Sequence, residues 1–324
     1  MAVTTKLYLA SLVALLAVLA TATDGSPELS ATYYKKTCPN VQNVVRTVMA
    51  HRVASEPRMS PAILRLFFHD CFVNGCDASL LLDRTDDMES EKDAVPTNVS
   101  LDGFDVIDEI KSALEHNCPA TVSCADILAL ASRDAVALLG GPSWSVPLGR
   151  KDSLYASKDA AENDLPNPHG DLGDLLKSFE EHGLDARDLT ALSGAHTIGK
   201  AHSCENYRDR VYGGEGANII DPSFAERRRQ SCEEGSGEAP FDEETPMVFD
   251  NSYFQDLIAQ RGLLTSDQEL YTHGGPVSDL VKMYAMHGET FFADFAKAMV
   301  KMGSIRPPQW MQAEVRLNCR VVNH

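Results

Sequence analysis

Two side chains able to do acid–base chemistry stand close together near residue 65 of this chain. Arg65 and His69 are four positions apart, so in a helix they project from one face. A guanidinium disfavours a charged imidazole beside it and leaves a neutral base next to a fixed cation. Such a pair can take a proton from a small acid and stabilise the anion that remains. Taken alone, His69 on an apolar segment is more often structural, and Arg65 is what favours catalysis.

A loop suited to a hard cation follows directly. Cys71 and Cys76 can close it around the turn dipeptide Asn74-Gly75. Short oxygen-bearing side chains flank this loop, namely Asp70, Asp77 and Ser79. Oxygen ligands of this kind around a tight turn are what calcium requires.

A second histidine lies in the segment Leu192-Ser-Gly-Ala-His-Thr-Ile-Gly199. We expect His196 at the end of a short helix, between small residues that let a flat ligand approach closely. Downstream, Asp267 offers a carboxylate that could accept the other imidazole N–H, as partners of metal-binding histidines usually do. From spacing alone, a surface loop is the alternative interpretation.

The first 22 residues have the order of a secretory signal peptide. Lys6 precedes an apolar run over 7–20, and small residues follow at 20–22. The run is shorter than the roughly 20 residues that a membrane span needs. We predict cleavage between about 22 and 28 and a mature chain that forms a single domain over 23–324.

Composition narrows the classes of function. Eight cysteines in a secreted chain predict four disulfides, for which 105 pairings exist. Their scattered positions argue against zinc. The formal charge is −18, and about −19 once Lys6 is removed with the signal peptide. A surface this acidic repels phosphate backbones, which argues against nucleic-acid binding.

Apolar periodicity predicts a mainly α-helical domain with little β-structure. We expect one helix to begin at Ser60-Pro61, with the serine as cap. Residues 83–103 and 212–247 are polar and predict a long loop and irregular structure, and Arg227-Arg228-Arg229 predicts a solvated turn. The other expected helices cover 40–52, 106–114, 123–139, 172–179, 185–193, 253–258, 277–284 and 291–300.

The combined motifs resemble the secretory plant peroxidases, the class III haem peroxidases. The resemblance rests on Arg65-Leu-Phe-Phe-His-Asp-Cys71, on the segment around His196 and on the eight-cysteine pattern. It extends through Val146-Pro-Leu-Gly-Arg-Lys-Asp-Ser153 and Phe249-Asp-Asn251, over roughly 290 residues.

The resemblance implies two helical halves that enclose one haem b, with four disulfides and two calcium ions. It implies an oxidoreductase that uses hydrogen peroxide to oxidise phenolic donors, such as lignin and wall phenolics, in two one-electron steps. Hydrogen peroxide catabolism and a response to oxidative stress follow from that activity. We expect a secreted monomer in the extracellular space or cell wall, without membrane or nucleic-acid partners.

The resemblance also implies roles for individual residues. Arg65 and His69 would be catalytic, and His196 would be the axial ligand of the haem iron. Asp267 and Phe241 would support His196, whereas Phe68 and Thr97 would line the distal side. Pro147 would lie near the donor. The implied calcium ligands are Asp70, Val73, Gly75, Asp77 and Ser79 at one site and Thr197, Asp242, Thr245, Val248 and Asp250 at the other. The implied disulfides are Cys38–Cys118, Cys71–Cys76, Cys124–Cys319 and Cys204–Cys232.

Three departures from the family pattern concern the active site. Thr97 stands where an asparagine usually accepts from the distal histidine, and Asn98 could substitute if the loop shifts by one residue. Asp102 replaces a common basic residue. One extra residue between His196 and Cys204 leaves the donor contacts around 201–207 unassigned.

Asn98-Val99-Ser100 is an N-glycosylation sequon, and the sequence leaves open whether Asn98 is modified. The rival functions are a calcium-binding wall protein without turnover and an intracellular peroxidase of the same superfamily. We expect the remaining histidines to face solvent: His51, His116, His169, His182, His202, His273, His287 and His324.

Overall fold

A computed structural model describes residues 28–97, 100–213, 219–234 and 237–323. The signal segment 1–22 and Asn98 therefore lie outside the described residues. Within these ranges the chain is mainly helical, as predicted. Its α-helices are α2 (Val41–Ser55), α3 (Met59–Phe72), α4 (Phe104–Asn117), α5 (Cys124–Leu138), α6 (Lys158–Asp164), α7 (Leu172–Glu181), α8 (Ala186–Ser193), α9 (Arg208–Tyr212), α10 (Pro222–Glu234), α11 (Ser252–Ile258), α12 (Thr265–Thr272), α13 (Gly275–Met286) and α14 (Gly288–Met302).

Short 3₁₀-helices and strands connect these helices. The 3₁₀-helices are η1 (Ser79–Leu81), η2 (Glu91–Asp93), η3 (Gly194–Thr197) and η4 (Cys204–Asn206). Four two-residue strands form two antiparallel ladders: β1 (Asp152–Ser153) with β4 (Ala313–Glu314), and β2 (Lys200–Ala201) with β3 (Ala239–Pro240). The prediction of little β-structure is confirmed.

The predicted helices with apolar stripes are present, but two details of the prediction were wrong. Helix α3 begins at Met59, without a side-chain cap, and the Ser60 hydroxyl is buried within the helix. By contrast, Ser123 does cap α5 by accepting from the Asp126 N–H at 3.3 Å.

The second error concerns 212–247, where irregular structure was expected but α10 forms. This helix is mostly polar and buries little besides Phe224 and Ala225, so it carries no apolar stripe that periodicity could detect. Arg227 and Arg228 are helical and pair with Glu243, rather than forming a solvated turn.

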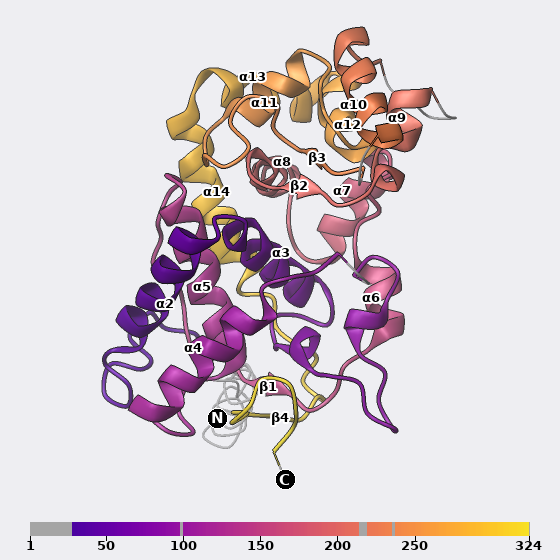
Figure 1. Cartoon of the computed structure of the whole chain (residues 1–324). Coiled ribbons are helices and arrows are strands. Elements are labelled where there is room, and N and C mark those ends of the chain that lie inside the picture. The colour runs from indigo at the N-terminus through magenta and orange to yellow at the C-terminus, as the bar shows by residue number, and fades with distance from the viewer. Residues whose placement is uncertain (1–27, 98–99, 214–218, 235–236, 324) are drawn as a thin grey trace, which may run out of the picture.

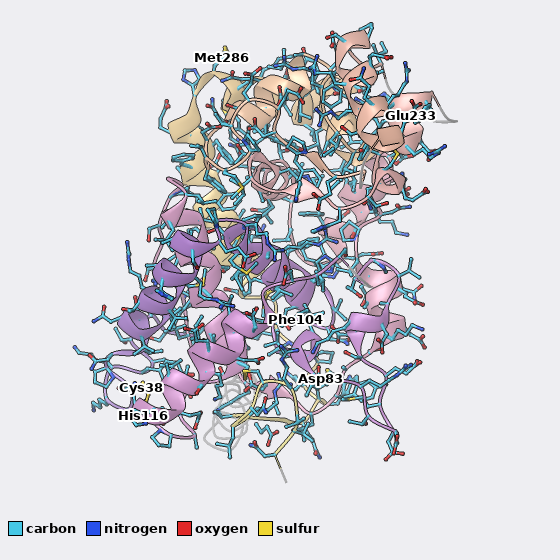
Figure 2. All side chains as sticks on the ribbon, viewed as in Figure 1. Cys38, Asp83, Phe104, His116, Glu233 and Met286 are labelled. Carbon is cyan, nitrogen blue, oxygen red and sulfur yellow. A yellow bond between two sulfur atoms is a disulfide. The ribbon has the colours of Figure 1, made fainter. Side chains whose placement is uncertain are left out.

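The helices form two groups, which α14 connects. Figure 1 shows α2–α5 and the β1–β4 ladder in the lower part of the molecule, and α8 and α10–α13 above them. In Figure 2, the labelled residues Met286 and Glu233 mark the upper end, and Cys38 and His116 mark the lower end. The groups touch where Pro61 in the first turn of α3 meets Gly199, so closely that a Cβ on Gly199 would lie 2.9 Å from Pro61 Cβ.

Four disulfides pin the loops to this helical frame, and their pairing is the one that the resemblance implied. They are Cys38–Cys118, Cys71–Cys76, Cys124–Cys319 and Cys204–Cys232. No described helix combines the length and the apolar character that crossing a bilayer requires.

His182, which we expected to face solvent, instead joins α7 to α3. Its Nδ1 lies 2.7 Å from the Ser178 carbonyl oxygen, and its Nε2 lies 2.8 Å from the Phe72 carbonyl oxygen. The ring also stacks on Phe72, with 4.3 Å between centroids. His182 therefore fixes the end of α3 just before the predicted calcium loop.

Candidate active site

The first histidine centre lies on α3, which brings Arg65 and His69 together as their spacing predicted. Arg65 Nε donates to His69 Nε2 at 3.1 Å. Because an arginine has only donors, His69 Nε2 must be the acceptor, and the neutral ring carries its proton on Nδ1. Burial and the charge of Arg65 hold the pKa of His69 well below its usual value. His69 is thus a neutral base beside a cation.

His69 Nδ1 is buried and has no hydrogen-bond partner among the described residues. Thr97 is also buried, but its hydroxyl lies within hydrogen-bond distance of the backbone carbonyls of Glu91 and Ala94, at 2.9 Å for Ala94. The Thr97 hydroxyl therefore bonds within its own loop. Among the described residues, Thr97 therefore does not supply the partner that the family pattern gives this base, and Asn98, the other candidate, lies outside them.

Arg65 has two further partners, on the loop opposite α3. Its Nη2 lies 3.1 Å from Ser100 Oγ and 3.2 Å from the Pro96 carbonyl oxygen. Burial lowers the pKa of Arg65 to about 10. Sequence reasoning missed Ser100 as a contact because it was considered only as part of a glycosylation sequon.

The second histidine centre lies at η3, directly after α8. His196 Nδ1 is 2.7 Å from Asp267 Oδ1, so the predicted carboxylate partner is present. Asp267 also accepts from the Tyr253 hydroxyl at 3.0 Å and from the Leu264 N–H at 2.9 Å. The ring of Phe241 stacks on His196 at 4.1 Å. Asp267 and Phe241 therefore fix the imidazole and leave Nε2 available to a ligand.

Helix α12 delivers Asp267, and the sequence did not reveal this helix. One of the small residues before His196, Gly194, packs against the core. A Cβ on Gly194 would lie 2.5 Å from the ring of Phe291 and 2.8 Å from that of Phe254. Gly194 is therefore required for packing against the core, and the expected approach of a flat ligand beside His196 stays a prediction.

Buried oxygen atoms converge at the loop after α3. Both carboxylate oxygens of Asp70, one of Asp77 and the hydroxyl of Ser79 are buried without hydrogen-bond partners. Burial and the neighbouring Asp77 raise the pKa of Asp70 well above its usual value, and burial raises that of Asp77 to about 7. Buried oxygen atoms that receive no hydrogen bond are costly, and a calcium ion would neutralise them.

The backbone of this loop turns tightly and packs closely against the C-terminal segment. Asn74 and Gly75 adopt positive φ angles of 63° and 90°. A Cβ on Gly75 would lie 2.6 Å from the backbone of Arg306.

Sequence reasoning missed Glu91, whose buried carboxylate has a pKa raised to about 8 by burial and by Asp77.

The second predicted cation cluster is also assembled, but its atoms satisfy one another. Thr197 Oγ1 lies 3.0 Å from Asp242 Oδ2 and 3.2 Å from Asp250 Oδ1, and Thr245 Oγ1 lies 2.9 Å from Asp250 Oδ2. Val248 joins the group through its N–H, which donates to the Thr245 carbonyl.

Within the described ranges, no group of three or more His, Cys, Asp or Glu side chains forms a metal site. The predicted ligand sets draw on carbonyl and hydroxyl oxygens as well, so this result does not count against them.

Comparison with known proteins decides the family. A family model described as peroxidase matches residues 41–287. Peroxidase 4 of Vitis vinifera is 48% identical over 305 residues, which cover 93% of this chain and 94% of the relative. The lignin-forming anionic peroxidase of Nicotiana sylvestris is 50% identical, with 91% and 92% covered. Peroxidase P7 of Brassica rapa subsp. rapa is 48% identical, with 91% and 100% covered.

The chain belongs to the class III plant peroxidases. It is an enzyme that oxidises phenolic donors with hydrogen peroxide, and its family binds haem. The rival interpretation of a binding protein without turnover is not supported. The two histidine centres of this peroxidase are therefore the natural candidates for the two sides of the haem.

Other predicted contacts of this peroxidase stay predictions. Phe68 lies on α3 with its ring edge-on to His69 at 5.4 Å. The Pro147 carbonyl accepts from Arg150 Nη1 at 2.8 Å, and no described interaction links Pro147 to His69 or His196. Asp102 forms an ion pair with Arg58 at the start of α3.

Residues 201–207 contain His202. Partial burial of its ring, together with the positive charge of Arg65, lowers the pKa of His202. The donor contacts expected of this segment stay a prediction.

Proposed function

We propose that this peroxidase binds one haem b between α3 and η3, where His196 Nε2 would hold the iron. The observation that carries the proposal is the pairing of His196 Nδ1 with Asp267 at 2.7 Å. A carboxylate on the far nitrogen fixes the tautomer, directs Nε2 toward the metal and increases the basicity of the ligand. When bound, the haem supplies the redox-active iron through which peroxide oxidises donors one electron at a time.

On the distal side, His69 acts as the base. Its Nε2 is unprotonated because it accepts from Arg65 Nε, so it is ready to take a proton from hydrogen peroxide. It then returns that proton to the oxygen that leaves as water. Arg65 stabilises the negative charge that develops on the departing oxygen. Phe68 limits access, and donors reach the haem edge near Pro147 and residues 201–207.

Two calcium ions complete the proposal. The buried acceptors without partners at Asp70, Asp77 and Ser79 support an ion at the distal loop, with the carbonyls of Val73 and Gly75 as further ligands. The second ion would replace the mutual hydrogen bonds among Thr197, Thr245, Asp242 and Asp250, with Val248 as a further ligand. Thr197 follows His196 directly, so that ion would stabilise the backbone of the iron ligand.

We place the enzyme outside the cell, as a monomer acting on wall phenolics and lignin precursors. All eight cysteines are in disulfides, which suits an oxidising compartment. The segment 1–22 has the order of a signal peptide. The name of the Nicotiana sylvestris relative adds lignin formation as a candidate role.

The visible spectrum of the purified protein tests the proposal. A Soret band that changes within a stopped-flow mixing experiment with hydrogen peroxide, and returns when a phenol such as guaiacol is added, is the expected result. A protein without a Soret band, or with one that peroxide leaves unchanged, would contradict it.

A further inference from the structure

The guanidinium of Arg65 is held from two directions. From its own helix, Nε donates to His69 Nε2 at 3.1 Å. From the loop 35 residues further along the chain, Ser100 Oγ lies 3.1 Å from Nη2, and the Pro96 carbonyl oxygen lies 3.2 Å from the same nitrogen. An arginine with only the first contact could still rotate about its long side chain.

Ser100 is suited to hold a cation because its own proton is directed elsewhere. The Arg65 guanidinium can only donate, so Ser100 Oγ must accept from it. The hydroxyl proton then points to the carbonyl of Pro96 or of Thr97, each 3.2 Å away. This arrangement fixes the serine lone pairs toward Arg65. Hydrogen bonds in which one partner is charged are the stronger ones.

We infer that Ser100 is a positioning residue for the peroxide reaction, because its hydroxyl fixes the Arg65 guanidinium in the orientation that stabilises the departing oxygen. The inference rests on the proposed function, since Arg65 has that role only there. It assigns a catalytic consequence to a hydroxyl that otherwise belongs only to a glycosylation sequon.

Loss of the Ser100 hydroxyl should slow the reaction with hydrogen peroxide but not the oxidation of the donor. In Ser100→Ala, Nη2 keeps the Pro96 carbonyl but loses its second acceptor, so the guanidinium populates other orientations. We expect the second-order rate constant for hydrogen peroxide to fall about tenfold, the size of one hydrogen bond to a charged group. The rate constant for a phenolic donor should stay within about twofold of wild type, because donor oxidation does not use Arg65.

The experiment compares wild type with three variants, refolded with haem and calcium from bacterial expression so that no glycan is present. Ser100→Ala removes the hydroxyl, and Ser100→Thr restores it. Ser90→Ala is the matched control, because Ser90 is another buried loop hydroxyl, which donates to the Leu82 carbonyl at 2.6 Å and has no described contact with Arg65. Stopped-flow measurements give the peroxide and donor constants separately.

A binding measurement complements the kinetics. Fluoride is a small anion whose binding on the distal side draws on the positive charge of Arg65, and its affinity can be read from the Soret band without any turnover. We expect fluoride affinity to fall about tenfold in Ser100→Ala and to stay close to wild type in Ser100→Thr and Ser90→Ala.

The outcomes separate this inference from the function on which it rests. Slow peroxide reaction and weak fluoride binding in Ser100→Ala alone, with normal donor oxidation, support it. A Ser100→Ala protein that matches wild type, or a Ser100→Thr protein as slow as Ser100→Ala, overturns it while the proposed function stands. An equal loss of peroxide rate in Ser90→Ala also overturns it, because the loss would then follow from removing any buried hydroxyl of the loop. A wild type that does not react with peroxide overturns the proposed function, and this inference with it.

Discussion

The two histidine centres differ in which ring nitrogen the protein holds. His196 is fixed through Nδ1, which lies 2.7 Å from Asp267, and the ring is stacked on Phe241. His69 is fixed through Nε2 by Arg65, and its buried Nδ1 has no partner among the described residues. The Asp267 carboxylate on Nδ1 makes the other nitrogen of His196, Nε2, a better metal ligand. The neutral His69 instead keeps its Nε2 free of a proton and can accept one there.

The two predicted cation clusters differ in a parallel way. Around Asp70 the buried oxygens lack partners, whereas around Asp250 the threonine hydroxyls already satisfy the carboxylates. Buried acceptors without donors are costly unless a cation or protons neutralise them. The distal cluster should therefore depend on calcium more strongly than the proximal one.

The largest expected effect comes from replacing His69, which tests whether it is the base of the two histidines. His69→Leu should keep the Soret band, because the proposed iron ligand is His196. It should react with peroxide about 10² to 10⁴ times more slowly, the contribution typical of a general acid–base group. Stopped-flow mixing measures this rate.

The exposed His51 on α2 provides the control for that experiment. His51→Leu should react like wild type. A His69→Leu protein that reacts as fast as the parent would contradict the assignment of His69 as the base.

Calcium removal tests the contrast between the clusters. With calcium a thousandfold above its Kd, the ion adds about 4 kcal/mol to stability, which EDTA would remove. Thermal unfolding with and without EDTA measures the loss. Asp70→Asn should make the protein much less responsive to EDTA, whereas Asp250→Asn should leave most of the response. Equal responses in the two variants would contradict the comparison.

The EDTA effect should also depend on pH. In the calcium-free protein the pKa values of Asp77 and Glu91 are about 7 and about 8, above those of the unfolded chain. The folded state then binds more protons than the unfolded one, so its stability falls as pH rises from about 4 to about 8. The Tm difference caused by EDTA should therefore be larger at pH 8 than at pH 5. A larger difference at pH 5 would argue against buried carboxylates as the ligands.

A smaller effect concerns the partner of the iron ligand. Asp267→Asn keeps the shape of the side chain but removes its charge, and such changes usually cost 10- to 100-fold in activity or metal affinity. Asp294→Asn is the matched control, because both carboxylates accept from a buried tyrosine hydroxyl at 3.0 Å. The control should lose stability but keep its Soret band and its rate. A similar loss of rate in both variants would show that the charge beside His196 is not the cause.

The sequence predicted the parts of the site that are local in the chain. Arg65 and His69 are four residues apart on one apolar helix, and helical geometry alone brings them together. The cation loop is likewise contained within a few residues of Cys71. Motif resemblance, rather than spacing, supplied the disulfide pairs, since eight cysteines leave too many alternatives.

The parts that the sequence did not predict depend on distant packing. Ser100 contacts Arg65 of α3, and Glu91 of η2 lies close enough to Asp77 for its pKa to be raised, but no periodic pattern marks these contacts. Helix α12 carries Asp267 without an apolar stripe of its own. His182 was expected in solvent because its two carbonyl partners become neighbours only after α7 packs against α3.

The smallest expected effect would make the two histidine centres more alike. Thr97→Asn offers an amide oxygen on a longer side chain, which can accept from the His69 Nδ1–H. That bond makes Nε2 more basic, so the peroxide rate constant should rise by a few-fold, up to about tenfold for a bond of 1.4 kcal/mol. Stopped-flow measurements at constant pH detect a change of this size.

Thr97→Val separates the two possible roles of the native side chain. Valine removes the hydroxyl at nearly constant shape. The Ala94 carbonyl then keeps only the backbone N–H of residue 97 as a donor, and the lost hydrogen bond should cost stability of about 1 kcal/mol. If the hydroxyl serves only its own loop, the peroxide rate of Thr97→Val should equal that of wild type. A clear loss of rate in this variant would mean that Thr97 does assist His69, and the asymmetry between the two histidine centres would then be smaller than the hydrogen bonds indicate.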